Sequence, residues 1–151
     1  MAACDKPYTV SDKWTASLTA GLLFGIISSP YTYSLTNKLS EAAGVTILSP
    51  AGTPTVIGLL AHGFVFVMII RLLINRSNNG CIKPYTSIDK WIVAAIGGLL
   101  FVVLSSPFLY DSINSLTTMI NVHTSVNGQP TPIGLGVHTA IFTLVTRLLM
   151  R

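Results

Sequence analysis

Two histidines are the residues of this sequence whose type and spacing are best suited to chemistry. His62 and His138 each follow a glycine by four residues, Gly58 and Gly134, within stretches that are otherwise apolar. Two ionisable residues at equivalent places inside a membrane could line a proton path or share a metal. A neutral histidine one helical turn from a small residue is also typical of close helix packing with an interhelical hydrogen bond. Because no carboxylate lies in either stretch, packing is the favoured interpretation.

The other polar residues form no pattern that predicts catalysis or ligand binding. His123 falls in a loop, Ser28 and Ser29 have no base at a suitable spacing, and Cys4 and Cys81 lack the paired spacing of a zinc site. There is no glycine-rich phosphate loop in the sequence. We therefore predict no catalytic residue, no cofactor and no metal site, and we do not expect an enzyme.

The composition indicates the solvent in which these residues must be positioned. Of the 151 residues, 50% are hydrophobic and only 9% are charged, with a mean hydropathy of +0.65. Water-soluble domains carry about a quarter charged residues, so an ordinary soluble globule is excluded. The alternative is a soluble bundle of helical hairpins with buried apolar helices, which is disfavoured because few polar residues remain to cover four such helices. The net charge is +4, but the basic residues are not clustered among aromatic ones, and we expect no nucleic-acid partner. The composition predicts a protein whose solvent is lipid.

The chain is a tandem repeat, which predicts two units, residues 1–76 and 77–151. A shift of 77 aligns the first half of each unit, and a shift of 76 aligns the second half, where the histidines fall on one another. The residue lost between the aligned blocks indicates a variable loop there. Matched segments are 12–14 with 89–91, 21–24 with 98–101, 28–30 with 105–107 and 71–73 with 147–149.

Each unit holds two apolar runs that approach the ~20 residues needed to cross a bilayer. We therefore predict an all-α membrane protein of four transmembrane helices, arranged as two tandem helical-hairpin repeats. An even number of spans in each unit makes the two repeats parallel. Ser11 or Asp12 is expected to cap the first helix. The predicted spans are residues 14–33, 55–74, 91–110 and 131–150.

The distribution of Lys and Arg predicts the orientation. All of them except Lys38 lie near the termini or between the second and third spans. By the positive-inside rule, these segments face the cytosol, and the loops 34–53 and 111–129 lie on the opposite side. Arginine at a span end can reach the headgroups while its stem stays in the apolar layer. The expected membrane-interface anchors are Lys13, Trp14, Arg71, Lys90, Trp91 and Arg147.

Two prolines are expected to interrupt the first span of each unit. Pro30 and Pro107 fall late in these runs, where the missing N–H would end or kink the helix. The serine pairs before them could bond the freed carbonyls, and helical spacing resumes beyond. The segments 45–48 and 122–126 then favour short extended structure leading into turns, as in hairpins.

The repeated unit resembles a known class of viral proteins. Its motifs are Lys-Pro-Tyr, Asp-Lys-Trp, Gly-Leu-Leu-Phe, Ser-Ser-Pro-Phe-Leu-Tyr at 105–110, Gly-x-x-x-His, and Arg-Leu-Leu-Met at 147–150. In two copies, they resemble small multi-span virion membrane proteins of nucleocytoplasmic large DNA viruses, such as phycodnaviruses and mimivirus relatives. The resemblance implies a protein of the virion inner membrane beneath an icosahedral capsid, made in host endomembrane. It implies no enzyme activity and no particular site residue.

The sequence and the resemblance together suggest a structural protein that links the viral inner membrane to the capsid through its loops. The expected partners are the lipid bilayer, minor capsid or other viral membrane proteins, and further copies of the chain. One alternative is a small oligomeric channel or proton pathway that uses His62 and His138. Another is a membrane-remodelling assembly factor that is left out of the virion.

Overall fold

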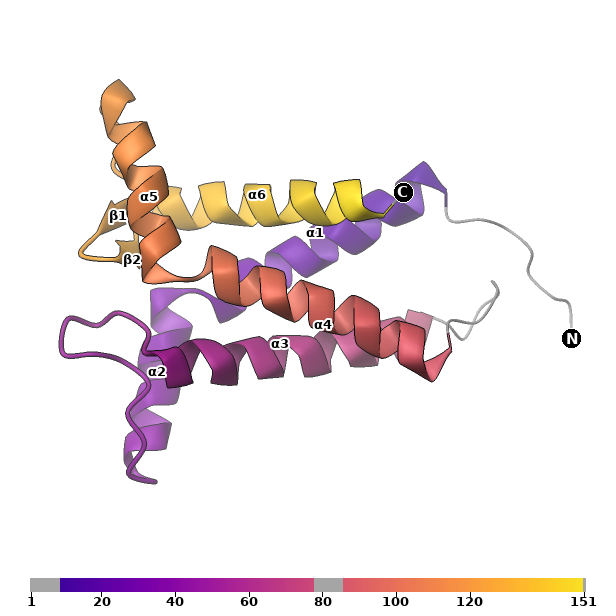
Figure 1. Ribbon diagram of the computed structural model, residues 1–151, viewed down its shortest axis with the longest axis horizontal. Helices are drawn as coiled ribbons and strands as arrows, with labels where there is room; N and C mark the ends of the chain where they lie inside the picture. Colours follow the sequence, from indigo (N-terminus) through magenta and orange to yellow (C-terminus); the bar gives the residue numbers. More distant parts are fainter. Residues whose placement is uncertain (1–8, 78–85, 151) are drawn as a thin grey trace, which may run out of the picture.

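The computed structural model describes residues 9–77 and 86–150, which are mostly helical. Four helices run side by side as a bundle, and two shorter ones cross one end of it (Figure 1). The bundle consists of α1 (Val10–Ile27), α3 (Val56–Ser77), α4 (Ser87–Leu104) and α6 (Pro132–Leu149). The end is crossed by α2 (Pro30–Glu41) and α5 (Pro107–Thr117), and α5 is followed by the 3₁₀ turn η1 (Thr118–Ile120) and the strands β1 (Ser125–Val126) and β2 (Gln129–Pro130).

Three helices of the described ranges are long and apolar enough to cross a membrane. They are α3 over Val56–Asn75, α4 over Ser87–Leu104 and α6 over Pro132–Leu149, with mean hydropathies of 2.4, 1.9 and 1.4. About three quarters of each segment is not buried inside the protein, since the buried shares are 28%, 22% and 22%. A helix that is apolar all round and still largely uncovered is typical of a membrane protein.

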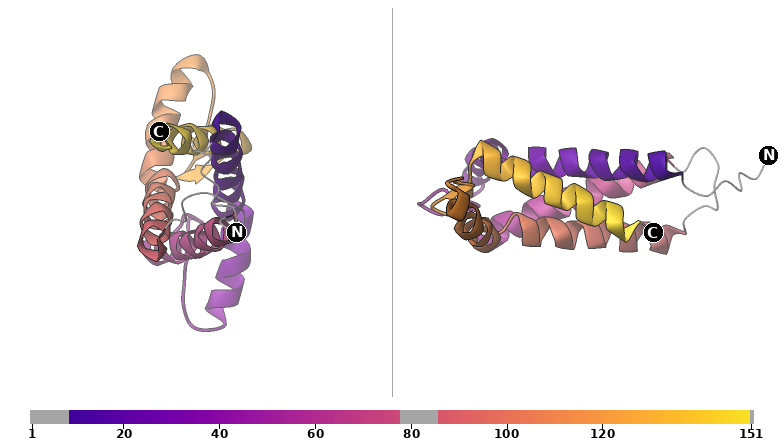
Figure 2. Two further views of the ribbon diagram at one scale, coloured as in Figure 1. Left: turned by 90° about the vertical axis from the view of Figure 1, so that its right-hand side faces the viewer. Right: turned by 90° about the horizontal axis from the view of Figure 1, so that it is seen from above.

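The closest helix pairs differ from the hairpins that the repeat predicts. α1 packs along α6 and α3 packs along α4, whereas α1 with α3 and α4 with α6 touch much less (Figure 2). Glycines explain the close pairs. A Cβ at Gly21 or Gly25 would collide with Thr143 or Thr139 of α6. The first and last bundle helices therefore join the two repeats, and neither repeat forms a close helical hairpin of its own.

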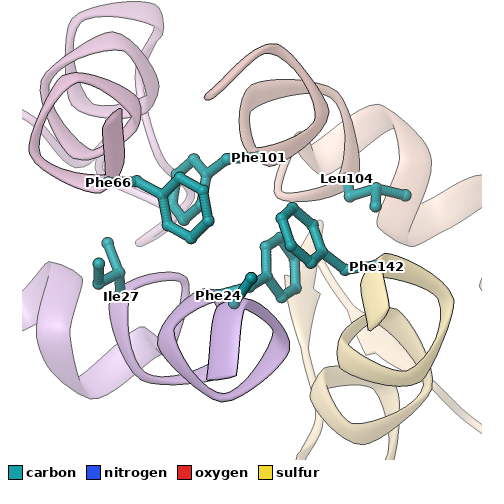
Figure 3. Close-up of a cluster of buried hydrophobic side chains, with 7 residues drawn as sticks. Phe24, Ile27, Phe66, Phe101, Leu104 and Phe142 are labelled. Atoms are coloured by element: carbon teal, nitrogen blue, oxygen red, sulfur yellow. The ribbon is translucent and has the colours of Figure 1, made fainter. Parts of the chain in front are cut away.

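Phenylalanines fill the centre of the bundle. One comes from each of the four helices: Phe24, Phe66, Phe101 and Phe142 (Figure 3). All four are at most 1% exposed, and neighbouring rings lie 4.8 to 5.5 Å apart between centroids in stacked and edge-on arrangements. Such pairs add about 0.5–1.5 kcal/mol each beyond their burial. The bundle axis is therefore closed by apolar rings at this level.

The first and third predicted spans end earlier than expected. α1 stops at Ile27 rather than at 33, and α4 stops at Leu104 rather than at 110. Pro30 and Pro107 do not kink a continuing helix, because each stands in the first turn of the next one, α2 or α5. A proline costs nothing there, since the N–H that it lacks has no partner within the helix.

Serines stabilise both sides of each break. The Ser28 hydroxyl donates to the Phe24 carbonyl at 2.6 Å, and the Ser105 hydroxyl donates to the Phe101 carbonyl at 2.5 Å. The next serine, Ser29, caps α2 by accepting from the Thr32 amide.

The carbonyls that lose their helical N–H to the prolines are those of Ile26 and Val103. The Ser106 hydroxyl donates to the Val103 carbonyl at 2.8 Å, as expected, whereas in the first unit the Thr32 hydroxyl donates to the Ile26 carbonyl at 2.6 Å. The expectation that the serine pairs bond the freed carbonyls is therefore confirmed for the second unit and wrong for the first.

Thr9, and not Ser11, caps the first helix. Its hydroxyl accepts from the Asp12 amide, and the Asp12 carboxylate accepts from the Thr9 amide and hydroxyl, which completes a capping box. These hydrogen bonds from Thr9 hold the pKa of the Asp12 carboxyl below its ordinary value. Thr86 and Asp89 form the same box at the start of α4.

One asparagine side chain in each crossing helix, α2 or α5, accepts hydrogen bonds from the loop that follows that helix. The Asn37 side-chain oxygen accepts from the Ile47 and Leu48 amides, both at 3.1 Å. The Asn114 oxygen accepts from the amides of Thr124 at 2.7 Å and Ser125 at 3.0 Å. These bonds hold each loop against its crossing helix.

Each loop then turns back as the sequence predicted. Leu48 pairs with Pro54 in an isolated antiparallel bridge, and β1 pairs with β2. The second turn is Asn127–Gly128, with φ of 50° and 73°, the left-handed conformation that these residue types favour in tight hairpins. The hairpin prediction is confirmed.

Candidate functional site

Each histidine lies against the break that ends a bundle helix. Nδ1 of His62, on α3, is 3.1 Å from the Ile27 carbonyl, and Nδ1 of His138, on α6, is 2.8 Å from the Leu104 carbonyl. A carbonyl oxygen only accepts, so Nδ1 carries the proton and donates. Ile27 and Leu104 are the last residues of α1 and α4, whose carbonyls lose their helical partner at the break. Each histidine therefore satisfies a backbone group that the break exposes.

The second ring nitrogens differ between the two centres. Nε2 of His62 is 2.8 Å from the Thr36 hydroxyl, whereas Nε2 of His138 is buried with no hydrogen-bond partner among the described residues. The shift of 77 places Ile113 where the first unit has Thr36. An isoleucine has no hydroxyl, so the equivalent residue of the second unit cannot repeat the bond that Thr36 makes in the first.

A tyrosine covers each histidine, and sequence reasoning missed this role. The Tyr33 ring stacks on His62 with centroids 3.9 Å apart and an interplanar angle of 7°. The Tyr110 ring is tilted by 52° to His138 at 4.3 Å. Both tyrosines fall on one another in the repeat, three residues after Pro30 and Pro107, which is the one signal in the sequence that could have found them.

A small cavity lies between the two tyrosines. Its volume is about 10 Å³, near the lower limit of the ~10–15 Å³ that one water molecule requires. An organic substrate or a hydrated ion does not fit in it. Both tyrosine hydroxyls are buried without a partner in the part of the chain that the structure describes. The lining residues are Ser28, Pro30, Tyr33, Gly52, Pro54, Tyr110, Gln129 and Pro130.

The histidines are not assembled as a metal centre in the described ranges. No group of three or more His, Cys, Asp or Glu side chains is close enough there to hold an ion. Nδ1 of each histidine also donates to the Ile27 or Leu104 carbonyl and is therefore not free to bind a metal. Cys4 and Cys81, whose spacing predicts no zinc site, lie outside these ranges. Within the ranges, both histidines make hydrogen bonds to the fold.

The predicted interface anchors meet in pairs at the other end of the bundle. The Arg147 guanidinium lies over the Trp14 ring at 5.4 Å, and Arg71 lies over Trp91 at 5.3 Å. Lys90 donates to the Asn75 side chain at 3.0 Å. Both cation–π pairs join helices of different repeats, and the sequence could not show this because it depends on how the helices pair.

Lys13, the remaining expected anchor, is half-buried next to Trp14 in the first turn of α1. Trp14 and Trp91 remain 40% and 45% exposed. Each ring therefore packs against an arginine and still leaves a large part of its surface uncovered. Trp and Tyr rings with one apolar and one polar side prefer the membrane–water interface. This end of the bundle has the residue types expected at a membrane–water interface.

The comparisons with known proteins add no relative. No protein-family model matches this chain, and no curated protein or solved structure matches it. Function is therefore argued from the geometry.

Proposed function

We propose that this chain is a structural integral membrane protein with four spans in two units, 1–76 and 77–151. Its setting, on the resemblance of its repeated motifs, is the inner membrane of a large DNA virus. There it links the bilayer to the capsid through its loops, with minor capsid proteins or other viral membrane proteins as partners. The observation that carries the proposal is an uncovered apolar surface around a core of phenylalanine rings, in the part of the chain that the structure describes.

The uncovered surface extends over all four bundle helices. At least half of each of the following side chains is exposed, in a protein whose core is already filled with phenylalanine. Soluble proteins rarely expose such continuous apolar area, whereas hydrocarbon requires it. The residues are Leu18, Leu22 and Ile26 of α1, Leu60 and Phe64 of α3, Ile92 and Leu99 of α4, and Ile133, Leu144 and Leu148 of α6.

α1 is the proposed fourth span, and its polar residues are compatible with lipid. The hydroxyls of Thr15, Ser17 and Thr19 each donate to the carbonyl four residues earlier, at 2.8 to 2.9 Å. A hydroxyl bonded inside its own helix needs no water. α4 is the equivalent of α1 in the second repeat, with the same kind of capping box and break. It has Ile92, Ala94 and Ile96 at the positions of these three residues. The lower hydropathy of α1 therefore does not prevent it from spanning.

The two ends of the bundle differ in a way that supports the proposed orientation. The Arg–Trp pairs lie at one end, where the positive-inside rule predicts the cytosolic side of the membrane of insertion. The loops that hydrogen-bond to Asn37 and Asn114 lie at the other end (Figure 1). We call residues 45–55 and 121–131 the loop layer. Its two loops touch, since the Gln129 side-chain amide donates to the Ala51 carbonyl at 2.9 Å, and together they are the proposed binding surface for a partner in an ordered array.

The phenylalanine cluster argues against the alternative of a pore through one chain. His62 and His138 lie on the loop side of Phe66 and Phe142, one helical turn earlier in α3 and α6. A polar path along the bundle axis would have to pass four stacked rings that offer no hydrogen bond. A channel would need a pore between copies of the chain.

The test is the copy number in purified virus particles. We would measure it by quantitative mass spectrometry after a carbonate wash that strips peripheral proteins. The proposal predicts retention with the membrane at a copy number on the scale of the capsid lattice. A few copies per particle would favour the oligomeric channel, and absence from the particle would favour an assembly factor of the host membrane. Either result would overturn the structural role.

A further inference from the structure

The crossing helices form two arms at one end of the bundle. α2 and α5 leave it roughly at right angles to the long helices and point in opposite directions (Figures 1 and 2). Each arm carries an exposed apolar stripe with a spacing of four residues. The stripes are Tyr31, Leu35 and Leu39 on α2, and Phe108, Leu116 and Ile120, with Met119 beside them, on α5 and η1. We call them the arm stripes.

The asparagine bonds show which way the stripes face. Asn37 points at its loop, and Leu35 and Leu39 are each two residues away, about 200° around the helix. The stripe of α2 is therefore on the side opposite the loop. Leu116 has the same relation to Asn114. Because the loops lie at the outer end, beyond the arms (Figure 1), the stripes face back toward the level of the bundle helices.

The one polar residue within a stripe is satisfied internally. Ser112 takes the place that Leu35 has in α2, and its hydroxyl donates to the Phe108 carbonyl at 2.8 Å. The flank of α2 next to its stripe carries Lys38, which is exposed. A lysine there can keep its stem on the apolar layer and its ammonium among lipid phosphates.

We propose that the arms lie in the headgroup layer of the bilayer that the bundle crosses, with the arm stripes immersed at the boundary of the acyl chains. Continuity selects lipid as the occupant. The stripes face the same layer as the exposed side chains of the bundle, such as Ile26 and Val103 near the breaks. Two arms that point in opposite directions fix the depth of the bundle and resist its tilting. This goes beyond the proposed function, which assigns the arms no role.

The test measures where nitroxide labels on the arms lie. In a protein whose Cys4 and Cys81 are changed to Ser, single cysteines are introduced as Leu39→Cys and Leu116→Cys and then labelled. Glu41→Cys is the control, because Glu41 is exposed about 200° around α2 from Leu39. Leu22→Cys, in α1, reports on the bundle. Each variant is reconstituted in phosphatidylcholine–phosphatidylglycerol vesicles, and collisions with oxygen and with a water-soluble nickel chelate are recorded.

We expect the labels at positions 39 and 116 to lose nickel collisions relative to position 41 and to gain oxygen collisions, as at position 22. Nickel collisions at 39 and 116 equal to those at 41 would show that the arms stand in water. Protection from both reagents would show that another protein copy covers them. Both results overturn this inference. If position 22 is also open to nickel, the membrane proposal itself fails, so the two failures are distinguishable.

Discussion

The two histidine centres share one hydrogen bond and differ in the other. In both, Nδ1 donates to the carbonyl at the end of a bundle helix, whereas only His62 has a partner for Nε2. A proton relay needs a second group on each ring, and among the described residues His138 has no such group. The bond common to both centres satisfies the carbonyl that the helix break leaves without a helical partner. The comparison indicates that each histidine ties its own helix to the end of another bundle helix, α3 to α1 and α6 to α4, at the break before the crossing helix.

The largest expected effect comes from the glycine one turn before each histidine. A methyl group at Gly134 would collide with the Thr124 carbonyl, and one at Gly58 would collide with the Ile47 carbonyl. Gly58→Ala and Gly134→Ala should each destabilise the fold by about 3 kcal/mol, the upper part of the range for overpacking. Thermal unfolding in detergent measures this.

Gly136 is the matched control for the glycine variants. It lies in the same helix, and an added Cβ there meets no atom within 4 Å. Gly136→Ala should be neutral, or stabilising by up to about 1 kcal/mol from helix propensity. Equal losses at positions 134 and 136 would show that the loop contact does not matter.

Removal of the histidines is expected to have the next largest effect. His62→Ala and His138→Ala leave the Ile27 or Leu104 carbonyl buried without a donor, at a cost of about 1–3 kcal/mol. His62→Ala should cost more, because it also removes the bond to Thr36. If proton flux into proteoliposomes falls while stability is unchanged, the structural role of the histidines is wrong.

Substitutions at Thr36 and at its equivalent, Ile113, should each make one histidine centre resemble the other. Thr36→Val leaves the His62 nitrogen unpartnered and should cost about 1 kcal/mol. Ile113→Thr offers His138 the missing hydroxyl and should recover a similar amount. Denaturation midpoints of the two variants and of wild type give the order. Stabilisation by Thr36→Val would contradict our account of the difference.

The smallest expected effect is at the opposite end of the bundle. Arg147→Gln removes the cation over Trp14 and should cost about 0.5–1 kcal/mol. Arg71→Gln should have the same effect through Trp91. Tryptophan fluorescence of each variant, followed through unfolding, reports on both stability and ring exposure. Unchanged fluorescence in both variants would show that the pairs do not form.

Sequence reasoning succeeded where a signal lies within one helix or one turn. The apolar runs located α3 and α6 to within a few residues of the predicted 55–74 and 131–150. The segment 122–126 leads into a turn as predicted, at Asn127 and Gly128, whose residue types favour the left-handed conformation found there. The repeat also brought forward His62 and His138, which the structure places at equivalent breaks.

It failed where the outcome depends on contacts between helices. The run from 14 to 33 carries no charge on either side of Pro30, so its lack of charge does not show that α1 ends at Ile27 and α2 turns away. The pairing of α1 with α6 depends on Gly21 meeting Thr143, and these residues are far apart in the chain. The role of Thr36 becomes visible only when the fold brings its hydroxyl to Nε2 of His62, and the repeat then gives Ile113 as the equivalent residue of the second unit.

The most direct test of the four-span account asks whether α1 crosses the membrane. Single cysteines at Ser11, Ala51 and Asn75, in a protein without Cys4 and Cys81, would be labelled in sealed microsomes with a membrane-impermeant maleimide. The account predicts that positions 11 and 75 react from the same side and that position 51 reacts from the other. If position 11 reacts from the same side as position 51, α1 does not cross, and the arrangement of two equivalent two-span units is wrong.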